Sequence, residues 1–170
     1  MRALDGGIKT AFLGFFGSHI PITLLVDGQG LASNLYPQPL RNLIAWYSDF
    51  FGDILMRHPS PSWFKGLIFS ELTFQVPFFV VAIRMILRTK PGDSYPRWFQ
   101  TLCIIYGAHT STTMVPILST FLLSDTMTST ERFVTTSVYL PYLAFPMWIL
   151  YLAAKDDFGG MPTGSDKKKQ

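Results

Sequence analysis

The residue of greatest chemical interest in this sequence is Glu71, because it lies inside a run of residues suited to the interior of a membrane. Between Gly66 and Ile83 it is the only formally charged side chain, with Gln75 about one helical turn later and Pro77 two residues after that. An acidic side chain at the centre of a membrane helix costs ~2.5–3.5 kcal/mol on insertion scales. A cost of that size indicates either a polar partner within the protein or a hydrated functional cavity.

Asp27 is a second acidic residue that could reach this region. It ends the uncharged apolar stretch Thr10–Val26, so we expect it at or just inside the membrane boundary. Glu71 lies eight residues beyond Trp63, which is roughly 12 Å into the membrane at the rise of an α-helix. Two carboxylates at one site of low dielectric hold about one negative charge between them. We expect the deeper Glu71 to be the protonated, hydrogen-bonding partner and Asp27 to carry the charge.

Three roles are compatible with this acidic pair. One negative charge walled by tyrosine and phenylalanine side chains complements a single ammonium group on an apolar body, through a salt bridge and cation–π contacts. The same groups could instead protonate an alkene and stabilise the resulting carbocation, as a sterol isomerase requires. The acids could also only fasten helices together, and an aspartate at the boundary could be a solvated helix end. We favour ligand binding and expect no catalytic residue, metal or cofactor.

The elements that would position these side chains are membrane helices. With 48% hydrophobic and 15% charged residues, and a mean hydropathy of +0.26, the chain is too apolar for an ordinary soluble domain of 170 residues. About 20 apolar residues suffice to cross a bilayer as a helix. Four segments approach that length: Thr10–Val26, Gly66–Ile83, Trp98–Ser124 and Phe133–Ala154. The fold class predicted is an all-α membrane protein, a four-transmembrane-helix bundle, with a domain at 10–154 between an N-terminal segment 1–9 and a disordered tail 155–170.

Each predicted span contains a proline, at Pro21, Pro77, Pro116 and Pro141. Proline removes a backbone donor and tends to kink a helix, so we expect four helices that splay around a pocket. The proline in the first segment, together with the lack of a small-residue cleavage site, argues that this segment is a retained helix and not a signal peptide.

Polar and amphipathic patterns place two further elements. The third span carries a stripe of polar residues and one proline at helical spacing: Tyr106, His109, Thr110, Thr113 and Pro116. Such a stripe faces other helices or a cavity and not lipid, and hydrogen bonds between helices alone would also explain it. Between the first two spans, apolar positions from Leu40 to Leu55 follow one helical face, which predicts an amphipathic helix over the lumenal end. The single cysteine, Cys103, excludes an internal disulfide and suits a buried apolar position.

Lys and Arg outside the predicted spans divide unevenly between the two sides. Ten lie on the side of both termini and the 84–97 segment, and four lie on the other side. The positive-inside rule then places both termini in the cytosol. The pI near 9.1 comes from this flank, so no nucleic-acid partner is implied.

Four stretches resemble the emopamil-binding (EXPERA) family, and the similarity runs roughly from Phe12 to Tyr151. These stretches are HIPITL at 19–24, FQVPFF at 74–79, PILSTF at 116–121 and VYLPY at 138–142. The resemblance implies a four-helix homodimer of the endoplasmic reticulum membrane, with the nuclear membrane as a second location. It also implies a pocket in the lumenal half that is closed from water and entered from the bilayer.

The resemblance further implies sterols, oxysterols and cationic amphiphiles as ligands, and a role in cholesterol homeostasis and trafficking. Membrane lipid and the Niemann–Pick type C cholesterol transporter are the other partners it suggests. The implied ligand-binding residues are Asp27, Glu71, Asp53, Gln75, His19, Tyr47, Met56, Thr113, Val138, Tyr139 and Tyr142. Lys167 to Lys169 are similar to a dilysine retrieval signal. One departure lowers the isomerase alternative, because the second helix lacks a histidine and a carboxylate one turn apart and has Gln75 there.

Overall fold

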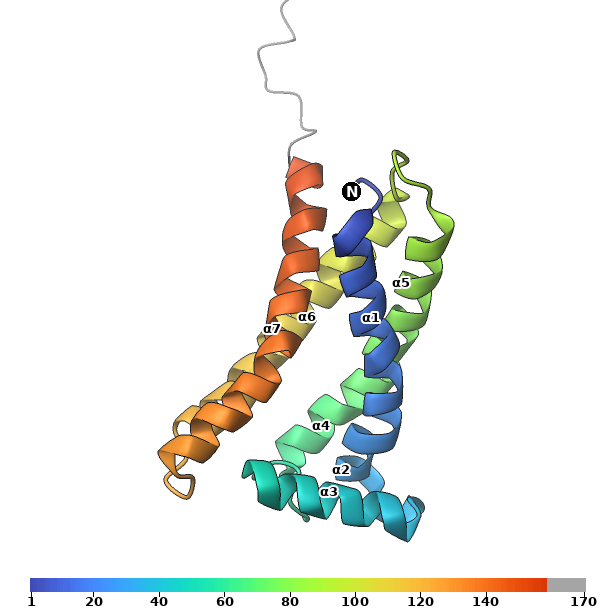
Figure 1. Ribbon diagram of the computed structural model, residues 1–170. Coiled ribbons are helices and arrows are strands. Elements are labelled where there is room, and N and C mark those ends of the chain that lie inside the picture. The colour runs from blue at the N-terminus through green and yellow to red at the C-terminus, as the bar shows by residue number, and fades with distance from the viewer. Residues whose placement is uncertain (159–170) are drawn as a thin grey trace, which may run out of the picture.

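The computed structural model describes residues 1–158, and these residues form an all-helical structure (Figure 1). The first helical stretch runs from Gly6 to Leu35 and consists of α1 (Gly6–Ile22), the π-helical turn η1 (Thr23–Asp27), α2 (Gly28–Ala32) and the 3-10 turn η2 (Ser33–Leu35). A second stretch is built alike, from α4 (Ser62–Ser70), the π-helical turn η3 (Glu71–Gln75) and α5 (Val76–Arg88). The remaining helices are α3 (Gln38–Phe51), α6 (Arg97–Leu122) and α7 (Ser129–Phe158). Helix α7 reaches Phe158 and so includes residues 155–158, which the sequence placed in a disordered tail. The rest of that predicted tail, with its three lysines, lies outside the described residues.

Three helical stretches within residues 1–158 are long and apolar enough to cross a membrane. They are Gly6–Leu35, Ser62–Arg88 and Ser129–Lys155, and they correspond to the first, second and fourth predicted spans. The third predicted span falls on α6, which has 26 residues. Its run of histidine, serine and threonine residues from 109 to 113 lowers its hydropathy below that of the other three.

The helices form a bundle that is closed more tightly at one end than at the other. Helix α1 lies beside α5, and α6 and α7 form a long antiparallel pair that leans away from α1 and α4 at the lower end of the view (Figure 1). Helix α3 lies across that lower end. The first residues, the α5–α6 loop and the end of α7 lie together at the upper end, where the backbone N–H of Tyr95 donates to the Met1 carbonyl at 2.9 Å.

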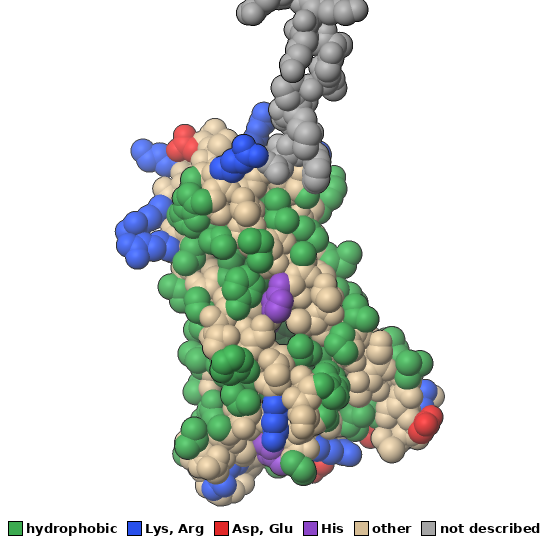
Figure 2. Space-filling view, turned by 180° about the vertical axis from the view of Figure 1, so that it is seen from behind, with side chains coloured by type: hydrophobic (Ala, Val, Ile, Leu, Met, Phe, Trp, Pro, Cys, Tyr) green, Lys and Arg blue, Asp and Glu red, His purple; other side chains and the backbone are tan. Residues whose placement is uncertain are grey.

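Charged side chains lie mainly at the two ends of the molecule. Figure 2 shows Lys and Arg toward the upper and lower ends of one face. Between them lies a broad band of hydrophobic and other uncoloured groups, with a histidine near its middle. This distribution is the one expected of helices that cross a bilayer. It also agrees with the predicted grouping of the described N-terminal residues with the 84–97 segment on one side.

The predicted amphipathic helix is present, but it ends earlier than the sequence pattern indicated. Gly52 adopts a left-handed conformation (φ +71°) that terminates α3, as glycine commonly does after the last helical residue. The apolar residues that follow do not continue the helical face. Leu55 instead turns into the interior, where it is buried against α3, α4 and α6 residues.

Two apolar cores hold the bundle together, one near each end. The core at the upper end is rich in aromatic residues, and in it Phe78 stacks on Tyr106 with ring centroids 4.1 Å apart. The core at the lower end joins α3, α4, α6 and α7 and contains Phe64 and Phe121. Gly107 brings α6 close to α7, because a Cβ atom at this position would lie 2.6 Å from both the Leu150 Cβ and the Pro146 carbonyl oxygen.

We expect Gly107→Ala to destabilise the protein, because the added methyl group must push α6 away from the α7 backbone. Overpacking of this kind costs about 1–3 kcal/mol and should lower the midpoint of thermal unfolding of the detergent-solubilised protein. Gly14→Ala is the matched control, because open space surrounds that position. The control should leave stability unchanged or raise it by up to about 1 kcal/mol. Equal effects of the two variants would contradict the close α6–α7 packing.

Candidate functional site

Two π-helical turns carry the polar residues that the sequence singled out. Pro21 lies just before η1, and Pro77 lies just after η3. Because proline cannot donate a backbone hydrogen bond, it interrupts the regular ladder, and a wider turn next to it accommodates the change. Insertions of this type are frequent at functional sites. Here η1 supplies Thr23 and Asp27, and η3 supplies Glu71 and Gln75.

A cavity of about 320 Å³ is bordered by both π-helical turns and by residues of both apolar cores. Its walls come from α1, η1, α3, α4, η3, α6 and α7, together with Met56 from the α3–α4 segment. Ten of the eleven predicted ligand-binding residues line it: His19, Asp27, Tyr47, Met56, Glu71, Gln75, Thr113, Val138, Tyr139 and Tyr142. The exception is Asp53.

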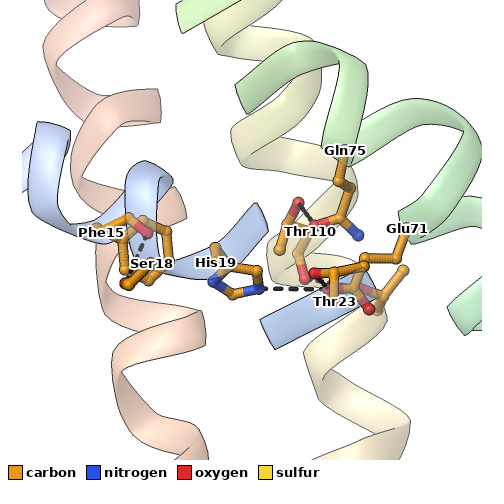
Figure 3. Close-up of polar contacts among 8 residues, drawn as sticks. Phe15, Ser18, His19, Thr23, Glu71, Gln75 and Thr110 are labelled. Atoms are coloured by element: carbon orange, nitrogen blue, oxygen red, sulfur yellow. Dashed lines mark hydrogen bonds and ion pairs between the residues drawn. The ribbon is translucent and has the colours of Figure 1, made fainter. Parts of the chain in front are cut away.

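Glu71 is held by two side chains from the first helical stretch. Its Oε1 atom accepts a hydrogen bond from the Thr23 hydroxyl at 2.7 Å and lies 3.2 Å from the His19 Nε2 atom (Figure 3). The His19 ring lies within 5.0 Å, centroid to centroid, of the Phe15 and Phe79 rings and 4.7 Å from the Tyr142 ring. The buried acid is therefore anchored across two helical stretches, in aromatic surroundings.

The direct hydrogen bond predicted between Asp27 and Glu71 is absent from the described structure. Thr23 and His19, which precede Asp27 by four and eight residues on the same helical stretch, contact Glu71 instead. Asp27 is partly buried and lines the cavity, and within residues 1–158 its carboxylate has no hydrogen bond or ion pair. The two acids therefore have different surroundings: Glu71 contacts two side chains of the first helical stretch, and Asp27 has no such contact among residues 1–158.

Asp53 lies behind the cavity wall and not on it. The side chain is fully buried, and its Oδ1 atom accepts hydrogen bonds from the backbone N–H groups of Leu55 (3.0 Å) and Met56 (3.1 Å). Its Oδ2 atom accepts a hydrogen bond from the Tyr139 hydroxyl at 2.7 Å. In this geometry Asp53 is a positioning residue, because it fixes the orientation of two wall residues, Met56 and Tyr139.

Burial has a direct electrostatic consequence for Asp53. Desolvation raises the pKa of this carboxyl group above its ordinary value of 3.8, although hydrogen bonds from Tyr139 and the backbone of Met56 and Leu55 oppose the shift. Desolvation, followed by the proximity of Asp53, also raises the pKa of the Tyr47 hydroxyl. This corner of the site therefore favours neutral groups.

The polar stripe predicted on the third span faces the second helical stretch, as expected. The Thr110 hydroxyl donates to the Gln75 Oε1 atom at 3.2 Å, and Tyr106, Thr110 and Thr113 line the cavity (Figure 3). His109 lies outside the cavity wall, with its Nε2 atom 3.0 Å from the Ser70 hydroxyl. The stripe thus has both roles that the sequence left open, since it joins helices and faces a cavity.

Sequence reasoning missed Thr23, the residue that binds Glu71 most closely. Its signal was the spacing of His19, Thr23 and Asp27 at i, i+4 and i+8, which places three polar side chains near one face of a membrane helix. Phe15 was also missed, and it extends the same face by one turn into the aromatic wall. The wall residues Leu43 and Trp46 on α3 gave no separate signal, because they look like ordinary members of an amphipathic helix.

Comparison with known proteins identifies relatives of this chain. Residues 39–153 match the family described as EBP: EXPERA (EXPanded EBP superfamily). The chain belongs to the EXPERA family. It is 42% identical to sigma intracellular receptor 2 of Homo sapiens over 156 residues, 85% of each chain. It is 38% identical to the Xenopus tropicalis protein of the same name over 152 residues, 84% of this chain and 85% of that one.

A more distant relative has a different name. Efficient mitochondria targeting-associated protein 19 of Schizosaccharomyces pombe is 34% identical over 146 residues, which cover 84% of this chain and 72% of the relative. The resemblance predicted from the sequence motifs is confirmed by these matches, and so is a multi-pass membrane protein. Cavity residues from Leu43 onward lie within the EXPERA match, whereas His19 and Asp27 precede it.

We expect Asp53→Asn to change how stability depends on pH. Because burial raises the pKa of this carboxyl above 3.8, the folded protein binds the proton more tightly than the unfolded chain. Protonated Asp53 therefore adds to the free energy of unfolding at low pH, and this contribution is lost as pH rises from about 4 through the raised pKa. Asparagine cannot take up this proton and so lacks this pH-dependent contribution to stability. The stability of Asp53→Asn relative to the unmodified chain should therefore increase as pH rises.

Thermal unfolding midpoints between about pH 4 and pH 8 would measure this difference. Asp49→Asn is the control, because the Asp49 side chain is 78% exposed and its amide should leave the pH profile nearly unchanged. A difference between Asp53→Asn and the unmodified chain that falls with rising pH would contradict the assigned direction.

Proposed function

We propose that this chain is a non-enzymatic receptor of the endoplasmic reticulum membrane that binds cationic amphiphiles and sterols or oxysterols in the cavity between its helices. The observation that carries this proposal is the carboxylate of Asp27, which lines the cavity without a partner in residues 1–158. An unpaired carboxylate in an apolar cavity is costly unless it takes up a proton or a cation satisfies it. A ligand ammonium group would supply that cation.

The walls suit the remainder of such a ligand. Aromatic side chains surround the acidic end of the cavity, including Phe15, Tyr139 and Tyr142, and their faces attract cations. Farther along, Ile68, Met114 and Ile117 form apolar walls that suit a hydrocarbon skeleton. The volume of about 320 Å³ is at the lower end of the range typical of small-molecule sites. The relatives named sigma intracellular receptor 2 support a receptor role.

The proposed membrane topology has four spans, with α6 as the third. Helix α6 runs antiparallel to α7 over most of its length (Figure 1), so a bilayer that contains α7 also contains α6. The Lys and Arg distribution supports both termini in the cytosol. A homodimer, a link to cholesterol trafficking and the Niemann–Pick type C transporter as partner remain proposals based on the resemblance.

Sterol isomerisation is the second candidate, and one distance favours it. The sequence offered no histidine and carboxylate one turn apart on the second span, but the fold brings His19 to within 3.2 Å of Glu71 from another helix. Such a pair could deliver a proton to an alkene and remove one from a neighbouring carbon. Asp27 could stabilise the intermediate cation.

The amine-binding proposal predicts unequal effects of two conservative substitutions. Asp27→Asn should weaken binding of a radiolabelled cationic amphiphile by about 30-fold or more, because loss of one partner of a buried charge pair costs about 2 kcal/mol or more. Glu71→Gln should weaken binding by roughly tenfold or less, since an amide oxygen can still accept the Thr23 hydrogen bond, worth about 1 kcal/mol. Asp49→Asn, outside the cavity, should bind as the unmodified chain does. Unchanged binding by Asp27→Asn would refute the salt bridge, and equal losses would show that Glu71 is also ionised.

Yeast that lacks its sterol Δ8–Δ7 isomerase separates the two candidate functions. A non-enzymatic receptor should not restore growth, although immunoblotting should show the protein in the membrane fraction. Growth restored by the chain and lost with His19→Gln would establish the isomerase alternative instead. His58→Gln is the matched control, because His58 is exposed and lies outside the cavity.

A further inference from the structure

A second, smaller hollow lies on the outer surface of the bundle, between α5 and α6. Its volume is about 180 Å³, and it is lined by Thr73, Phe74, Pro77, Phe78, Val81 and Leu102. It shares no lining residue with the main cavity. Because its walls are almost entirely apolar and α5 is a membrane-spanning candidate, its occupant within a bilayer must be a hydrocarbon group.

The face of α5 that borders this groove continues into two arginines. Pro77, Val81, Arg84 and Arg88 are spaced at i, i+4, i+7 and i+11, so they form one stripe along the helix. At a rise of 1.5 Å per residue, Arg84 and Arg88 lie roughly 5 and 10 Å beyond Val81 toward the α5–α6 loop. The stripe therefore passes from an apolar groove to two cations at the membrane boundary.

These cations have no acidic partner in the described part of the chain. Arg84, Arg88 and the nearby Lys90 are exposed, and no carboxylate of residues 1–158 lies within ion-pair distance of them. Exposed apolar side chains, Val80 and Leu87, flank the stripe on α5. Figure 2 shows Lys and Arg gathered at the upper left of that view, over the end of α5, with an acidic side chain near the top of the group and apolar side chains below.

We propose that this groove and its arginines bind one anionic phospholipid, with an acyl chain in the groove and the phosphate on Arg84 and Arg88. The order of the groups along α5 matches the order in a phospholipid, whose hydrocarbon chain is buried and whose charged headgroup lies at the surface. Charge complementarity selects anionic over zwitterionic lipids, because a choline headgroup would place a further cation beside the arginines. The site is separate from the amine and sterol cavity and does not depend on it.

Native mass spectrometry of the full-length protein tests this site directly. The probes are phosphatidylserine and phosphatidylcholine with the same acyl chains, and we expect a one-to-one adduct that favours phosphatidylserine by at least about tenfold. Arg84→Gln combined with Arg88→Gln should weaken the phosphatidylserine adduct by about 30-fold, which corresponds to about 1 kcal/mol for each arginine. Arg57→Gln combined with Lys65→Gln removes the same charge at the opposite end and should have no effect. Equal retention of the two lipids, or equal effects of the two double variants, would overturn the proposal and leave the arginines as determinants of orientation only.

The groove is tested with the arginines intact. Val81→Trp fills it from α5, and Leu102→Trp fills it from α6, so misfolding of one variant does not prevent the test. Each should weaken phosphatidylserine retention at least fivefold, and glycerophosphoserine, which lacks acyl chains, should not displace the lipid at equal concentration. Full displacement by glycerophosphoserine, or unchanged retention by both folded tryptophan variants, would overturn the assignment of the groove and identify a simple phosphate site.

Discussion

The hydrogen bond between Thr23 and Glu71 is the interaction on which the site depends. It joins the two helical stretches that contain π-helical turns, and with His19 it provides the polar partners that a carboxyl group requires inside apolar helices. Because Glu71 is satisfied within the protein, the second acid, Asp27, is left at the cavity wall without a partner among the described residues. One acid therefore helps to build the site, and the proposed receptor function assigns ligand recognition to the other.

Prolines explain why the two polar segments, η1 and η3, depart from regular α-helix. A proline near each of them withholds a backbone donor, and the wider turn next to it alters the direction in which the following side chains point. Thr23, Asp27, Glu71 and Gln75 all lie on these two turns. On the opposite wall, Asp53 orients Tyr139 and Met56 from behind. Several side chains of the cavity wall are thus held in position by contacts with other protein groups, which is the arrangement that favours selective binding.

Hydrophobic length predicted the helical class and three of the spans. Ten of the residues that line the cavity were also predicted, several of them only through the resemblance to the EXPERA family. Hydrophobic length identifies spans, and a charge or tyrosine within a span marks an inward face. What the sequence could not predict were contacts between separate helices. Thr23 and His19 contact Glu71 in place of Asp27, and Asp53 lies behind the wall although the family resemblance implied a ligand contact. Such differences depend on helix rotation and on π-helical turns, which no spacing rule along one helix specifies.

A structure of the protein with a bound cationic amphiphile would test the division of roles between the two acids most directly. The account predicts the ammonium nitrogen within about 4 Å of an Asp27 carboxylate oxygen, the distance of an ion pair. It also predicts that Glu71 keeps its contacts with Thr23 and His19. An ammonium group bound to Glu71, with Asp27 left free or those two contacts broken, would contradict it.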